Sequence, residues 1–240
     1  MSTLSEKMKS ARKPYVSAVV VAGGSGTRFG GDKLMADLAG VPVLVHTLRA
    51  FERTPLINEI VLVTRKEILG EMAEFCARYG IQKVMRVVSG GKTRLESSYA
   101  GVASVSPKCG VVAIHDGARP LVTQSVIENA LWQANRKGAA VPAVGVRDTI
   151  KQAKDSVVYA TPDRVELFAV QTPQCFQADL IRTALSAALD KAPNITDDCM
   201  AVERLGGHIW LTEGSEENIK ITTPLDLVLA EVILQRRKEA

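Results

Sequence analysis

The sequence predicts an α/β fold built on a doubly wound, mostly parallel sheet, and three observations lead to this prediction. Apolar runs of strand length alternate with segments of helical periodicity along most of the 240 residues. Runs such as SAVVVAG (17–23) and EIVLVT (59–64) are apolar throughout, which is typical of strands buried on both faces. Several runs end in glycine-containing turns, and repeated units of this length imply right-handed crossovers between parallel strands.

In the first part of the chain, helices are expected where apolar residues recur at every third or fourth position. Leu44, Leu48 and Phe51 follow this spacing. Gly80 and Gly138 stand where two such helices would end. We therefore expect strands at 17–23, 59–64, 83–91, 111–117 and 139–146, with helices at 41–51, 66–79, 95–105 and 123–137.

The strand–helix alternation breaks at residues 147–170. This segment is rich in β-branched and polar residues, contains a Lys-Asp turn and has no helical face, which predicts a β-hairpin arm that projects from the main sheet. Beyond it, two helices are expected at about 177–190 and 197–205, followed by HIWLTEG and NIKITT as strands. Thr223, Pro224 and Asp226 supply an N-cap, a first-turn proline and an acid for the last helix.

Composition limits the class of protein. No composition break divides residues 16–240, so we expect a single domain after a basic, disordered tail at 1–15. No apolar run reaches the length of about 20 residues that spans a membrane, and no secretory signal stands at the N-terminus. Four cysteines without CxxC spacing are most simply buried thiols, which indicates a cytoplasmic protein, and the three scattered histidines do not suggest a zinc site.

The net charge of +4 is concentrated at the two ends of the chain. Residues 1–13 contain four cations and one acid, and the final RRKEA contains three cations and one acid. The body between them is close to neutral, so it does not have the basic surface expected of a nucleic-acid-binding domain. We therefore expect neither nucleic acid nor a membrane as a partner.

The first glycine-rich loop, GGSGTRFGGDK (23–33), directly follows a predicted strand. It fails the dinucleotide pattern GxGxxG because Phe29 stands at the last glycine, and it fails the Walker pattern because Asp32 precedes Lys33. What remains is a loop whose backbone amides are able to surround phosphates, with Arg28 and Lys33 as charges. The alternative is an ordinary strand-to-helix turn with exposed cations.

Two further loops favour the phosphate interpretation. SGGKTR (89–94) is a second glycine-containing turn, and HDGARP places Asp116 at the end of a predicted strand. A carboxylate at that position is suited to hold Mg²⁺ against a triphosphate. Arg119 follows three residues later, and a surface ion pair is the alternative role for these two residues. The chain offers no conspicuous Ser–His–Asp or Cys–His set, which agrees with transfer chemistry that needs positioning and charge.

These motifs together resemble a known family. GGSGTR, GGDK, GGKTRLES, HDGARP, VRDT, TPQ, ITD and NIKIT occur in the order found in the 2-C-methyl-D-erythritol 4-phosphate cytidylyltransferase family of non-mevalonate isoprenoid biosynthesis. The resemblance covers about residues 16–235. It implies a nucleotide-diphospho-sugar transferase-like, Rossmann-like fold and a homodimer that interlocks through the arm at 147–170.

The resemblance also implies roles for individual residues. Arg28, Lys33, Arg164 and Lys220 would be catalytic, and Asp116 would bind Mg²⁺. The nucleotide site would contain Ala22, Gly23, Gly24, Gly91, Lys92, Ser97 and Gly117. The polyol phosphate would be held by Arg119, Thr149, Arg164, Thr172 and Thr196.

The expected activity is transfer of CMP from CTP to 2-C-methyl-D-erythritol 4-phosphate, which yields 4-diphosphocytidyl-2-C-methyl-D-erythritol and pyrophosphate. Two alternatives stay open on the sequence: a ribitol 5-phosphate cytidylyltransferase, which shares most motifs, and a non-catalytic nucleotide-binding module. The second alternative would have less need of Arg28, Lys33, Asp116 and Lys220 together.

Overall fold

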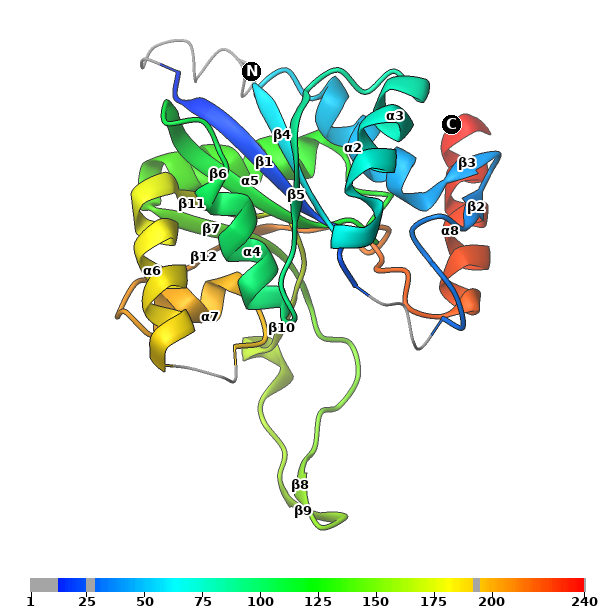
Figure 1. Cartoon of the computed structure of the whole chain (residues 1–240). Coiled ribbons are helices and arrows are strands. Elements are labelled where there is room, and N and C mark those ends of the chain that lie inside the picture. Colours follow the sequence, from blue (N-terminus) through cyan, green and yellow to red (C-terminus); the bar gives the residue numbers. More distant parts are fainter. Residues whose placement is uncertain (1–12, 25–28, 192–194, 240) are drawn as a thin grey trace, which may run out of the picture.

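The computed structural model describes residues 13–24, 29–191 and 195–239, with side chains in this range except those of 190 and 191. A central sheet is covered by helices on both faces, and a thin hairpin extends away from one edge (Figure 1). Most of the tail expected at 1–15 lies outside the described residues, and Tyr15 already belongs to the first strand. No helix in the described part of the chain is long and apolar enough to cross a membrane.

The sheet has a parallel core with one antiparallel insertion. Its described strands run in the order β10-β7-β11-β6-β1-β4-β5, with β12 also paired to β7. β10 and β11 are antiparallel to their neighbours, and the other pairings are parallel. The bounds are β1 Tyr15–Val21, β4 Glu59–Thr64, β5 Val84–Ser89, β6 Cys109–Asp116, β7 Ala139–Gly145, β10 Phe168–Val170, β11 Gln174–Gln177 and β12 Trp210–Glu213.

Alternate residues of the central strands face two helical layers. Ala18 and Val20 of β1 pack with residues of α2, α3 and α5, whereas Val19 packs with residues of α4, α6 and α7. α8 covers the short β2–β3 hairpin beside the sheet. The bounds are α2 Val43–Arg53, α3 Leu69–Arg78, α4 Arg94–Ala103, α5 Gln124–Lys137, α6 Ala178–Lys191, α7 Asp198–Glu203, α8 Pro224–Glu239, β2 Asp37–Leu38 and β3 Val41–Pro42, with short 3₁₀ turns η2 Lys66–Ile68 and η3 Arg164–Glu166.

The predicted fold class is confirmed, and the structure corrects several elements. The helix expected at 41–51 begins only at Val43, because Val41–Pro42 form β3. β11 was not expected, although it lies between β6 and β7 and separates them. The segment NIKITT (218–223) was expected to be a strand, but it is not one. Its backbone instead makes single hydrogen bonds to loops, such as Ile221 N–H to the Ala118 carbonyl at 2.8 Å. It therefore crosses the ends of the strands without joining the sheet.

The projecting arm is a hairpin of β8 Gln152–Lys154 and β9 Val157–Ala160 (Figure 1). Its turn is formed by Asp155 and Ser156, both with positive φ, one residue later than the expected Lys-Asp turn. The expected boundary at 170 is too late, because β10 pairs with β7 in the main sheet. Val157 and Tyr159 of the arm are 69% and 68% exposed. The described chain therefore leaves an apolar hairpin in solvent.

Candidate active site

A pocket of about 220 Å³ opens at the carboxyl ends of β1, β5 and β6. This is the edge at which open α/β sheets bind ligands. The loops after these strands supply most of the wall, and Lys220 reaches it from the segment after β12. The lining residues are Val21, Ala22, Gly23, Gly24, Lys33, Leu34, Gly91, Lys92, Thr93, Arg94, Ser97, Asp116, Gly117, Ala118 and Lys220.

The glycines of this pocket permit close approach between loops. The Gly117 N–H donates to the Val21 carbonyl at 2.8 Å, and a Cβ on Gly117 would lie 3.1 Å from that oxygen. A Cβ on Gly91 would lie 2.3 Å from the Glu96 side chain. The Gly91 N–H donates to Ser97 Oγ at 3.2 Å, which closes the second loop over the start of α4. Bare backbone therefore forms two walls of the pocket.

Lys33 lies on a loop that is anchored through its neighbour Asp32. The Asp32 carboxylate accepts a hydrogen bond from Arg65 at 2.6 Å and another from the Leu34 N–H at 3.2 Å. Arg65 directly follows β4, so this ion pair ties the loop to the sheet. The Lys33 side chain then forms part of the pocket wall.

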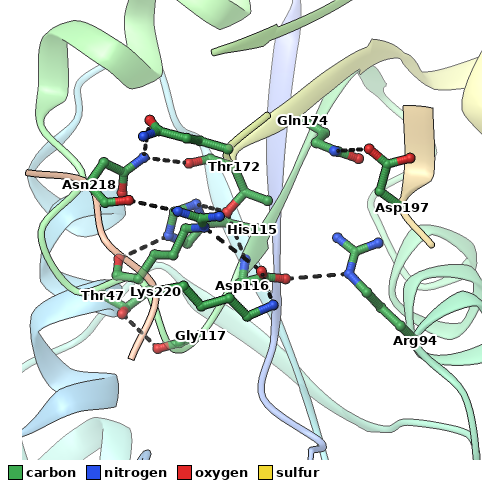
Figure 2. A network of polar contacts seen from close by, with 12 residues as sticks. Thr47, Arg94, His115, Asp116, Gly117, Thr172, Gln174, Asp197, Asn218 and Lys220 are labelled. Carbon is green, nitrogen blue, oxygen red and sulfur yellow. Dashed lines mark hydrogen bonds and ion pairs between the residues drawn. The ribbon is translucent and has the colours of Figure 1, made fainter. Parts of the chain in front are cut away.

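Asp116 is the charged centre of the site (Figure 2). Lys220 Nζ lies 2.7 Å from Oδ2, Arg94 Nε lies 3.4 Å from Oδ1, and Arg119 Nε lies 3.9 Å from Oδ2. Burial alone would raise the pKa of this carboxyl, but Arg94, Lys220 and Arg119 outweigh burial and hold the pKa well below its ordinary value. The carboxylate is therefore ionised at neutral pH.

A buried network fixes the backbone of Asp116. Its N–H donates to Thr172 Oγ1 at 3.1 Å, and the same hydroxyl contacts His115 Nδ1 at 3.0 Å. Because the Arg119 carbonyl only accepts, His115 Nε2–H donates to it at 3.1 Å, and in a neutral ring Nδ1 then accepts from the Thr172 hydroxyl. Burial lowers the pKa of His115 to about 4, so the imidazole is neutral.

Lys220 is positioned by the side chain of Asn218. Asn218 Nδ2 donates to Gln171 Oε1 at 3.1 Å and to the Thr172 carbonyl at 3.0 Å. The Asn218 carbonyl accepts from Arg119 Nη1 at 2.7 Å. These bonds tie the start of NIKITT to Gln171 and Thr172, just before β11, and to Arg119. They also bring Lys220 over Asp116 (Figure 2).

The predicted site residues divide into those in the pocket and those outside it. The pocket wall includes all seven expected nucleotide-binding residues, Ala22, Gly23, Gly24, Gly91, Lys92, Ser97 and Gly117, together with Lys33, Asp116 and Lys220. Arg119 and Thr172 lie directly behind Asp116. Arg28 lies outside the described residues.

Three expected residues are not among those that line this pocket in the described chain. Thr149 is exposed on the arm, and Arg164, also on the arm, donates from Nη1 to the Arg147 carbonyl at 3.0 Å. Thr196 is exposed just before α7, where its hydroxyl contacts Met200 Sδ at 3.9 Å. Within one chain, the structure does not bring the arm residues to Asp116.

Sequence reasoning missed four residues that organise the site: Arg94, His115, Asp198 and Asn218. Arg94, His115 and Asn218 stand inside the motifs GGKTR, HDGARP and NIKIT, which is a signal that could have identified them. No local pattern shows that Asn218 and Asp198 are buried. Their burial, 0% exposed for Asn218 and 1% for Asp198, follows from long-range packing.

The metal-binding capacity of the site consists of one carboxylate. No group of three or more His, Cys, Asp or Glu side chains able to hold an ion is found in the described ranges. Mg²⁺ commonly uses one or two carboxylates together with substrate phosphates and water, so Asp116 at the pocket wall has the chemistry for a shared ion. The nearby lysines suit the remaining phosphate charge. The residues present therefore fit a magnesium ion that arrives with a triphosphate.

Comparisons with known proteins agree with this geometry. The family model of 2-C-methyl-D-erythritol 4-phosphate cytidylyltransferase matches residues 16–236. The enzyme of that name from Alkaliphilus oremlandii is 45% identical over 231 residues, which cover 93% of this chain and 96% of the relative. The one from Caldanaerobacter subterraneus is 43% identical over 229 residues, covering 92% and 99%.

Solved structures give the same result. The crystal structure of 4-diphosphocytidyl-2C-methyl-D-erythritol synthase from Anaerococcus prevotii superposes with a TM-score of 0.83 at 30% identity, covering 93% of this chain and all of that chain. The Thermus thermophilus 2-C-methyl-D-erythritol 4-phosphate cytidylyltransferase gives 0.73 at 29% identity, covering 90% and 98%. The chain therefore belongs to the 2-C-methyl-D-erythritol 4-phosphate cytidylyltransferase family of nucleotidyltransferases.

Proposed function

We propose that this protein transfers CMP from CTP to 2-C-methyl-D-erythritol 4-phosphate in isoprenoid biosynthesis. The observation that supports this most directly is the single pocket that unites two glycine loops, Lys33, Lys220 and Asp116, in a chain matched by the family model over residues 16–236. The phosphate oxygen of the polyol forms a bond to the α-phosphorus of CTP. The bond from that phosphorus to the β-phosphate bridge breaks, and pyrophosphate leaves with the electron pair.

In this reaction the protein supplies position and charge. The backbone of Gly23, Gly24 and Gly91 approaches the nucleotide, as loops without side chains permit. Lys33 and Lys220 neutralise charge that moves toward the pyrophosphate as it leaves. Electrostatic groups placed in advance toward developing charge contribute more than groups that must reorganise.

Asp116 would hold Mg²⁺ together with the triphosphate. When bound, the ion supplies charge neutralisation and orients the phosphates. Lys220 Nζ lies 2.7 Å from Oδ2 of the same carboxylate, where it would also meet the charge of the phosphates. Arg94 and Arg119 remain beside the carboxylate and keep it ionised.

We also propose that two copies of the chain interlock through the arm, so that Thr149 and Arg164 serve the site of the partner subunit. Two facts support this proposal: both residues are exposed on the arm, and the arm's apolar side chains are in solvent in the single chain. A two-stranded hairpin is marginally stable alone and gains from packing on another surface. The polyol phosphate would then bind between subunits, with Arg119 and Thr196 on its own chain.

A cytoplasmic location is part of the same proposal. All four cysteines are free and buried, and burial raises the pKa of Cys76 to about 11. Free thiols without disulfide partners are typical of proteins in a reducing compartment.

The function is tested by incubating the purified protein with CTP, Mg²⁺ and one polyol phosphate at a time. Pyrophosphate release and a new diphosphate signal in ³¹P NMR are expected with 2-C-methyl-D-erythritol 4-phosphate. Release with ribitol 5-phosphate alone would establish the other cytidylyltransferase. Binding of CTP without release from any polyol phosphate would establish the non-catalytic module.

A further inference from the structure

Arg94 joins two carboxylates that lie on different elements. Its Nη2 lies 2.8 Å from Asp198 Oδ2, whereas its Nε lies 3.4 Å from Asp116 Oδ1. The Arg94 side chain is 25% exposed and contributes to the pocket wall, while the Asp198 carboxylate is 1% exposed and lies behind it. The guanidinium is therefore closer to the buried acid than to the acid of the active site.

The backbone of Arg94 is fixed by side-chain caps at the start of α4, where Thr93 is the N-cap. The Glu96 N–H donates to Thr93 Oγ1 at 3.1 Å, and the Lys92 N–H donates to Glu96 Oε2 at 2.5 Å. Gly101 brings α4 so close to the sheet that a Cβ there would lie 2.3 Å from Val19 Cγ1. This close packing holds α4 against the sheet, so we expect the side chain of Arg94 to reorient and the helix to stay in place.

Asp198 is fixed just as firmly from the other side. Its N–H donates to Gln174 Oε1 at 2.9 Å, and the Cys199 N–H donates to the same oxygen at 3.1 Å. Gln174 Nε2 donates to Asp197 Oδ2 at 2.8 Å (Figure 2). These bonds tie the start of α7 to β11 and hold the Asp198 carboxylate facing Arg94.

A buried ion pair contributes little net free energy to the stability of a fold. Taking an ion pair out of water costs several kcal/mol per ion, and an apolar pair of similar volume is often as stable or more stable. The Arg94–Asp198 pair lies next to Asp116, the proposed magnesium ligand, which suggests a role for the Asp198 charge at the active site. Without Asp198, the nearest carboxylate for the Arg94 guanidinium would be Asp116.

We propose that Asp198 is a positioning residue that acts through Arg94 and keeps the guanidinium from closing onto Asp116. Because Arg94 pairs with Asp198, its contact with Asp116 Oδ1 is the longer one, at 3.4 Å. Asp116 Oδ1 is therefore available to a metal ion. This inference rests on the proposed metal-binding role of Asp116. Groups that orient a metal ligand typically change metal affinity or activity by about 10–100-fold when they are removed.

The test uses Asp198→Asn in the full chain, which preserves shape and removes the charge. Mn²⁺ is titrated by electron paramagnetic resonance with the α,β-methylene analogue of CTP, because Mn²⁺ accepts the same oxygen ligands and the analogue does not react. We expect the variant to bind Mn²⁺ about 10–100-fold more weakly than wild type. Unchanged Mn²⁺ affinity in a folded variant would overturn the inference.

Glu59→Gln is the matched control. Glu59 is also a buried carboxylate paired with an arginine, since Arg86 Nη1 lies 3.1 Å from it, but it stands at the start of β4, at the opposite edge from the pocket. It should lose stability and keep the Mn²⁺ affinity of wild type. Equal loss of Mn²⁺ affinity in both variants would mean that any buried ion pair matters in this way, and would overturn the assignment.

A double-mutant cycle asks whether Asp198 acts through Arg94. Asp198→Asn should lower kcat in the wild-type background and have no further effect in Arg94→Met, because the side chain it positions is then absent. Additive effects on kcat would contradict the inference. If Asp198→Asn does not fold, Arg94→Met replaces it in the Mn²⁺ titration: with no guanidinium to compete for Asp116, Mn²⁺ affinity should be at least that of wild type, and a loss of affinity would overturn the inference. If wild type releases no pyrophosphate, the proposed function fails, while the Mn²⁺ titration still decides this inference.

Discussion

Replacing Thr172 by valine tests the buried network that holds the backbone of Asp116. The hydroxyl accepts from the Asp116 N–H at 3.1 Å and donates to His115 Nδ1 at 3.0 Å, and Thr172 is 4% exposed. Valine has nearly the same shape but makes neither bond. Both partners would then be buried without a hydrogen bond, and water has little access to replace it.

The expected cost follows from counting these two groups. Each buried polar group left unsatisfied costs about 1–3 kcal/mol, so Thr172→Val should lower the free energy of unfolding by about 2–6 kcal/mol. This is a large share of the 5–15 kcal/mol typical of a folded domain. Thr172→Ser keeps the hydroxyl and loses only a methyl group, so it should cost about 1 kcal/mol.

Urea unfolding followed by circular dichroism measures both variants, and steady-state kinetics at saturating CTP separates two roles for the threonine. A positioning role predicts that Thr172→Val lowers kcat, because Asp116 moves. A role limited to binding the polyol phosphate predicts a higher KM for that substrate with normal stability. If Thr172→Val were as stable as Thr172→Ser, the hydrogen-bond assignment would be refuted.

Four further predictions follow from the charges of the site and the arm. Asp116→Asn should lower kcat about 10²–10³-fold, as does the loss of one preorganised electrostatic contact, and near-normal turnover at saturating Mg²⁺ would show that the acid is structural. Lys33→Ala should lower kcat more than it raises KM for CTP, since contacts made only in the transition state appear in kcat; a loss confined to CTP affinity would contradict this. Heterodimers of Lys33→Ala with Arg164→Ala chains should regain activity if subunits share sites, and verified heterodimers without activity would exclude sharing. His115 should make the free energy of unfolding depend on pH, because its pKa is about 4 in the folded chain and about 6.5 in the unfolded chain. Its contribution is fully present above about pH 6.5, and about 3 kcal/mol is lost as the pH falls to 4. Urea unfolding of wild type and His115→Gln at several pH values will measure this loss.

The parts of the site that could be predicted from sequence are those coded by local pattern. Gly23 and Gly24 follow the buried strand β1, Gly91 follows the edge strand β5, and Asp116 ends the buried strand β6. The rule that ligands bind at the carboxyl ends of the strands therefore placed them together before the structure did. Lys33 and Lys220 were assigned through resemblance to the family, and both line the pocket. Thr149 and Arg164 remain predictions, because a single chain holds them on an arm away from Asp116.

The sequence by itself determined the alternation of strands and helices, since apolar periodicity is a property of neighbouring residues. Only the tertiary structure decided that β11 separates β6 from β7, that NIKITT is not a strand, and that Arg94 stands between Asp116 and Asp198. Each of these depends on contacts between segments far apart in the chain: Arg94 and Asp198 are brought together because α4 and α7 both pack on α6, while Gln174 of β11 binds the start of α7. The energies of such long-range contacts depend on which surfaces pack together in the fold, and the pattern of neighbouring residues does not encode this.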